Sequence, residues 1–155
     1  MRQGVWRVAA CVLGFAAYFG AACERATGDA QAEIAAMLAS STASWNHGDL
    51  AGFMDDYVPD STLSYVSGRG VLYGWQPLFD RYQRVYFAPG AARDSLAFTD
   101  LVVRSLDDDL ALATARFQLT RGDSVVASGP FTLVLERRGA RWLILHDHTS
   151  SDPKP

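Results

Sequence analysis

Apolar residues recur at helical spacing in the first half of the chain and alternate with polar residues in the second half. The helical spacing predicts three helices, over residues 30–45, 50–57 and 75–87. The alternation predicts one short strand and four long ones, over residues 62–67, 95–105, 110–121, 125–137 and 141–149. Short turns rich in Gly and Asp separate the long strands, so neighbouring strands should pair antiparallel. The order predicts an α+β fold, with three N-terminal helices packed against one face of a curved, mainly antiparallel sheet.

The final strand adds polar groups to this pattern. Strict alternation places Leu143, Leu145, Asp147 and Thr149 on one face, and Trp142, Ile144, His146 and His148 on the other. The first face continues the apolar faces of the preceding strands, so we expect it to be the concave face over the helices, with Asp147 as its one carboxylate. We expect the second face to be convex and to form a homodimer interface around its four named residues, because a large aromatic side chain there would otherwise lie in water.

The first 22 residues form a separate unit. Arg2 and Arg7 precede an unbroken apolar run that ends in the small residues Gly20-Ala21-Ala22, as in a secretion signal. We expect a signal peptide over residues 1–22, a short linker over 23–29, one domain over 30–150 and a tail over 151–155. Cys23 is the candidate lipid-attachment residue, because Ala-Ala-Cys resembles the lipid-attachment box of bacterial lipoproteins. The protein is therefore expected to be exported, either periplasmic or anchored to the bacterial envelope, and to meet the membrane only through its signal or this lipid.

Charge and cysteine content exclude several classes of function. The formal net charge is −3, which gives no basic field and argues against nucleic acid as a partner. The only two cysteines, Cys11 and Cys23, precede the domain, so the domain holds no internal disulfide, thiolate metal site or cysteine nucleophile.

Three motifs resemble the nuclear transport factor 2-like superfamily: Asn46-x-Gly48-Asp49-Leu50, Gly74-Trp75 and the terminal Trp142-x-Ile144-x-His146-x-His148-x-Ser150. The chain looks closest to the SnoaL-like bacterial branch, and it is also similar to the association domain of calcium/calmodulin-dependent protein kinase. The resemblance implies a cone, open at one end, in which a bent sheet wraps three helices and dimerises through its convex face. It places Thr149 in the cavity, where the kinase domain has an arginine. It implies no single activity, because isomerases, dehydratases, cyclases, epoxide hydrolases and binding modules share this cone.

Asp147 is the candidate catalytic residue. Apolar neighbours would disfavour its charged form, which raises the pKa and makes the carboxylate a usable general base. Tyrosines from the helices and the short strand would orient it or polarise a carbonyl. The residues expected to line the pocket are Trp45, Tyr57, Tyr65, Tyr82, Tyr86, Phe117, Phe131, Leu133, Leu145 and Thr149. A purely structural carboxylate, paired with an arginine or capping a helix, is the alternative.

The histidines suggest two further sites, and neither is expected. His146 and His148 share a face as a metal-binding pair would, but a third ligand is missing and His47 is the only other histidine. Ser150, His148 and Asp147 cannot converge as a catalytic triad, because adjacent strand residues point to opposite faces.

Three functions remain open from the sequence. The first is an exported dimeric domain that binds a small, mostly apolar ligand in the cone. The second is an isomerase, dehydratase or cyclase that needs no cofactor and uses Asp147 as general base. The third is an assembly module without chemistry. A polar group within hydrogen-bond reach of Asp147, with room for a substrate, would favour the enzyme.

Overall fold

The computed structural model describes residues 18–90 and 93–153, with side chains from residue 30 onward. The elements are α1 (Tyr18–His47), α2 (Leu50–Met54), β1 (Ser64–Ser67), β2 (Gly70–Tyr73), α3 (Trp75–Val85), β3 (Ser95–Ser105), β4 (Leu110–Arg121), β5 (Ser124–Arg138) and β6 (Arg141–Thr149). Most of the predicted signal peptide lies outside the described residues. Within the described ranges, no helix is long and apolar enough to cross a membrane.

Helix α1 begins earlier than the sequence pattern predicted. It starts at Tyr18 rather than at Ala30, and it includes residues 23–29, which were expected to form a linker. These residues contain no proline, and their one glycine, Gly28, costs a helix only about 1 kcal/mol, so the helix continues through them. The helix ends as predicted at Gly48, whose φ of 82° suits glycine at a helix C-terminus. The Asp49 carboxylate then caps α2 by accepting a 2.9 Å hydrogen bond from the Gly52 amide.

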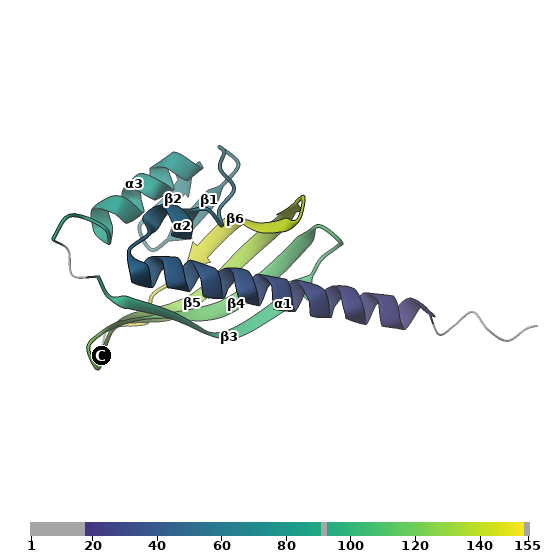
Figure 1. The fold of residues 1–155 in the computed structure, drawn as a ribbon. Coiled ribbons are helices and arrows are strands. Elements are labelled where there is room, and N and C mark those ends of the chain that lie inside the picture. Colours follow the sequence, from purple (N-terminus) through teal and green to yellow (C-terminus); the bar gives the residue numbers. More distant parts are fainter. Residues whose placement is uncertain (1–17, 91–92, 154–155) are drawn as a thin grey trace, which may run out of the picture.

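The sheet has six strands in the order β2-β1-β6-β5-β4-β3 and is antiparallel except where β1 joins β6. That parallel pairing aligns residues 64–66 with residues 146–148. Strand β2 was not predicted; it forms because the turn through Gly70, with a φ of 109°, folds the chain back on β1. Figure 1 shows α1 lying along the curved, unclosed sheet, with α2 and α3 gathered at one end of it.

The core lies between α1 and the sheet. Ile34, Leu38 and Trp45 of α1 are buried, and so are Leu133 and Leu135 of β5. Burying each such side chain stabilises the fold by roughly 1.5–3 kcal/mol. The predicted concave face of β5 is therefore the one that packs on the helices.

Strand β6 does not keep the predicted alternation. Val134 pairs with His146 and Leu135 pairs with Ile144, which leaves Leu145 as the extra residue of a β-bulge. One extra residue exchanges the two faces for everything that precedes it in the strand. Trp142 and Ile144 therefore lie on the concave side, 4% and 2% exposed. The predictions that they lie on the convex face, and that Leu145 faces the cavity, are wrong for this reason.

Candidate functional site

Asp147 lies buried on the concave face of β6, with one hydroxyl group on each of its carboxylate oxygens. The Tyr57 hydroxyl donates a 2.9 Å hydrogen bond to Oδ2, and the Thr149 hydroxyl donates a 2.7 Å bond to Oδ1. Thr149 faces the same way because it is two residues further along the strand. Tyr57 follows α2, where Val58 and Asp56 hydrogen-bond to Ile144 and fix this segment against β6. Among the described residues, Asp147 forms no salt bridge, which argues against the ion-paired alternative.

Burial sets the acidity of this carboxyl group. Desolvation raises the pKa of Asp147 to about 6, and the hydrogen bonds from Thr149 and Tyr57 only partly oppose the rise. The same burial, together with the nearby Asp147 charge, raises the pKa values of Tyr57 and Tyr82 well above 10. At neutral pH the site therefore holds an ionised carboxylate among neutral phenols, which are hydrogen-bond donors.

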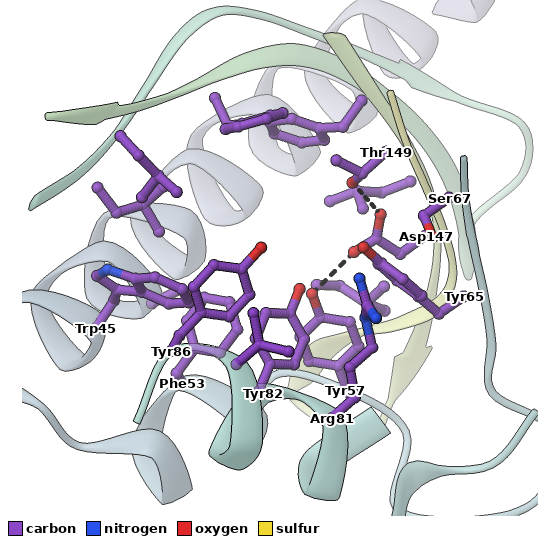
Figure 2. Close-up of a pocket in the computed structure, with 18 of the residues that line it drawn as sticks. Trp45, Phe53, Tyr57, Tyr65, Ser67, Arg81, Tyr82, Tyr86, Asp147 and Thr149 are labelled. Carbon is purple, nitrogen blue, oxygen red and sulfur yellow. Dashed lines mark hydrogen bonds between the residues drawn. The ribbon is translucent and has the colours of Figure 1, made fainter. Parts of the chain in front are cut away.

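Asp147 faces a cavity of about 390 Å³, a size within the usual range for small-molecule sites. Figure 2 shows Tyr57, Tyr65 and Tyr82 directed toward the carboxylate, while Trp45 and Tyr86 line the far side. Trp45 packs edge-on against Phe53 and Tyr82, with ring centroids 5.2 and 6.0 Å away. The cavity thus has an aromatic wall and one carboxylate.

The register of β1 explains how distant segments meet here. Tyr65 pairs directly with Asp147 across the parallel β1–β6 ladder, so both side chains point to the concave face. Tyr82 lies on α3, and Tyr86, four residues later, is the C-cap of that helix, so the two side chains lie on the same side of it.

Most of the residues expected to line the pocket do surround this one cavity. They are Trp45, Tyr57, Tyr65, Tyr82, Tyr86, Phe117, Phe131, Leu133 and Thr149, together with Asp147. Leu145 lies outside it, and Ile144 takes its place because of the bulge.

The remaining candidates lie elsewhere. Trp142 packs under α1, where its indole Nε1 donates a 2.8 Å hydrogen bond to Glu33. His146 stays on the convex face, with its Nδ1 2.7 Å from the Ser64 hydroxyl, and His148 is exposed. The described residues contain no group of three or more metal-ligating side chains. The side chain of Cys23 is not among those described, so lipid attachment stays a prediction.

Sequence reasoning missed two arginines of the cavity. Arg81 of α3 and Arg69 of the β1–β2 turn both line it. Arg81 had a signal: it lies three residues after Leu78 and four before Val85, within the apolar stripe of the helix. Its guanidinium carbon lies 5.6 Å from the centre of the Tyr65 ring.

A second buried carboxylate was also missed. Burial raises the pKa of Asp56 to about 6, opposed by a hydrogen bond with Ser41 and by Arg141, whose Nη2 lies 3.5 Å from Oδ1. Asp56 does not line the cavity, so it resembles Asp147 in acidity but not in position.

Comparison with known proteins assigns the chain to a family. The family model of the SnoaL-like domain matches residues 34–153. The chain belongs to the SnoaL-like family. No functionally curated protein matches it in sequence.

Solved structures with the SnoaL-like, nuclear transport factor 2-like fold agree with this membership. A protein of unknown function from Shewanella oneidensis is 28% identical, with a TM-score of 0.69 over 76% of this chain and 96% of its own. A putative calcium/calmodulin-dependent protein kinase II association domain from Xanthomonas campestris is 23% identical, with a TM-score of 0.61 over 79% and 88%. A Catenulispora acidiphila protein in complex with S-DNPA is 22% identical, with a TM-score of 0.66 over 81% and 95%. The last two share the fold alone with this chain.

Proposed function

We propose that this SnoaL-like domain is a cofactor-independent enzyme that moves a proton within a small, mostly apolar substrate, with Asp147 as general base. The observation that carries the proposal is a buried carboxylate on the wall of a cavity, with a pKa of about 6 and two hydroxyl groups holding it. A base is most effective when its pKa lies near the working pH, because it is then ionised and still binds a proton well.

The surrounding groups support a defined sequence of events. The ionised Asp147 takes a proton from a carbon next to a substrate carbonyl, and the electrons of the broken C–H bond move onto the carbonyl oxygen. A neutral phenol at the cavity, Tyr82 or Tyr65, donates a hydrogen bond to the oxygen as its negative charge develops. Protonated Asp147 then returns the proton to another atom of the same molecule. This gives an isomerisation. If the next carbon bears a hydroxyl group, the enolate electrons instead form a C=C bond, the C–O bond breaks, and protonated Asp147 gives its proton to the departing oxygen, which leaves as water.

Deuterium exchange tests this step without knowledge of the natural substrate. Proton NMR in heavy water follows the loss of the methylene signal of phenylacetone, an aromatic ketone with acidic protons. We expect exchange that rises with pH through about 6, because only ionised Asp147 accepts the proton. Asp147→Asn should slow it by roughly two to four orders of magnitude. Asp56→Asn is the matched control, since Asp56 has the same raised pKa outside the cavity. Exchange that is equal in wild type and Asp147→Asn contradicts the proposal.

Ligand binding without turnover is the second candidate. The aromatic wall around Trp45 favours it, because such surfaces hold apolar molecules whether or not chemistry follows. The complex of the Catenulispora acidiphila protein with S-DNPA supports binding as a use of this fold. In that case Asp147→Asn changes affinity modestly, and no exchange activity exists to lose.

Export and self-association are further parts of the proposal. Export is supported by the apolar segment that ends at Ala22 before Cys23. Self-association is supported by the convex side of β5 and β6, where Val134 and His146 pair and remain half-buried at the surface.

A further inference from the structure

The cavity holds more positive charge than negative charge. Arg69 and Arg81 line it, and Asp147 is its one acidic residue. Arg81 is half-buried, and Figure 2 shows its guanidinium inside the cavity beside Tyr65. Neither arginine forms an ion pair with a described carboxylate. A guanidinium removed from water without a counter-ion is costly, so the position favours a bound anion.

Arginines elsewhere in the described chain behave differently. Five of them form ion pairs with acidic residues: Arg116, Arg121, Arg137, Arg138 and Arg141. Among the arginines whose side chains are described, those without such a pair that do not line the cavity are exposed to water: Arg84, Arg93 and Arg104. Arg81 is therefore distinguished by being half-buried, unpaired among the described residues and directed into a cavity.

Arg81 and Asp147 both act on Tyr65, but they do not form an ion pair with each other. The guanidinium acts on the Tyr65 hydroxyl and opposes the rise in the pKa of Tyr65, whereas the groups that act on Asp147 are Thr149, Tyr57 and His148. Arg81 thus does not neutralise the carboxylate, and its charge remains available to a ligand. Its planar fork can form two parallel hydrogen bonds with one carboxylate group.

We propose that the ligand of this cavity is an organic anion, with an apolar or aromatic body against Trp45 and a carboxylate that Arg81 binds and Arg69 attracts at the entrance. The proposal rests on the use of the cavity as a substrate site. The body and the charge of such a molecule match the aromatic wall and the guanidinium respectively. Its reacting carbon has to lie within reach of Asp147, the base of the proposed function.

Two probes of the same shape test this directly. Isothermal titration calorimetry compares naphthalene-2-carboxylate with the uncharged naphthalene-2-carboxamide. We expect wild type to bind the carboxylate at least about tenfold more tightly, as charge-assisted hydrogen bonds to a guanidinium require. Arg81→Met should remove this preference and leave amide affinity within about twofold. Arg84→Met, on the same helix but outside the cavity, should behave as wild type.

Several outcomes overturn the proposal. Equal affinity of wild type for both probes, equal weakening of both by Arg81→Met, or no binding of either probe would assign Arg81 to packing on Tyr65 alone. Failure of this test is distinct from failure of the proposed enzyme. If wild type shows no preference for the carboxylate probe but its deuterium exchange still depends on Asp147, only the anion site is refuted. If wild type prefers the carboxylate probe but catalyses no exchange, only the proposed catalysis is refuted.

Discussion

Asp147 is buried and forms no salt bridge with the described residues, and this has a thermodynamic cost. In the unfolded chain the carboxyl group loses its proton near its ordinary pKa of 3.8, whereas in the folded protein it does so near 6. Between these values the unfolded state binds fewer protons, so the free energy of unfolding falls as the pH rises. The stability that comes from binding this proton in the folded state is fully present below pH 4 and is lost above pH 6.

Asp147→Asn should therefore stabilise the protein at neutral pH. The amide cannot ionise, so the variant avoids a cost of about 3 kcal/mol above pH 6 and gains nothing below pH 4. Urea unfolding at pH 4 and at pH 7.5 measures the difference. Asp108→Asn, in the exposed turn between β3 and β4, serves as the control and should change the free energy of unfolding by less than about 0.5 kcal/mol. A destabilised Asp147→Asn at pH 7.5 would mean that the carboxylate serves the fold rather than the site.

At the scale of elements, the sequence predicted α3 and the four long strands to within about two residues, because each carries a strong period and a clear stop. It extended α2 to Tyr57, whereas the helix ends at Met54 and Tyr57 forms a bridge with Ile144. The positions of Asp147 and Thr149 followed from alternation at the end of β6. The faces of Trp142 and Ile144 did not, because a β-bulge at Leu145 leaves no mark in a pattern that is apolar on both sides. Strand β2 was missed for a related reason: four residues bounded by glycines carry too little periodicity.

The bulge turns Trp142 from a surface residue into a core residue. It is 4% exposed, its ring lies 4.5 Å from the Arg137 guanidinium, and its Nε1 bonds Glu33. Trp142→Ala should lower the free energy of unfolding by about 3–5 kcal/mol, as large-to-small changes in a core do. Unfolding measured at two protein concentrations should give the same loss, because the contacts lie within one subunit. His148→Ala, an exposed neighbour, should change stability by less than about 0.5 kcal/mol. If the loss of stability depended on protein concentration, Trp142 would instead lie at a subunit interface.

At the scale of the whole molecule, the bulge moves the proposed dimer interface without removing it. The convex face still presents His146, opposite Val134, but it no longer presents Trp142 and Ile144. Val134→Glu should give monomers by sedimentation velocity if two convex faces pair, because the carboxylate would lose its water at the contact. Val125→Glu, at the exposed start of β5, should leave the subunit number unchanged. A wild type that sediments as a monomer at all concentrations contradicts self-association.

The parallel β1–β6 ladder has a consequence for how the molecule opens. It aligns only three residue pairs, whereas β6 meets β5 along most of its length. Tyr65 and the turn with Arg69 lie on one side of this seam, and Asp147 lies on the other. A short ladder separates at lower free energy than a long one, so amide protons of β1 exchange with solvent without global unfolding. A ligand that contacts Asp147 on one side and Tyr65 or Arg69 on the other holds β1 against β6. Ligand binding should therefore slow amide hydrogen exchange in residues 64–67.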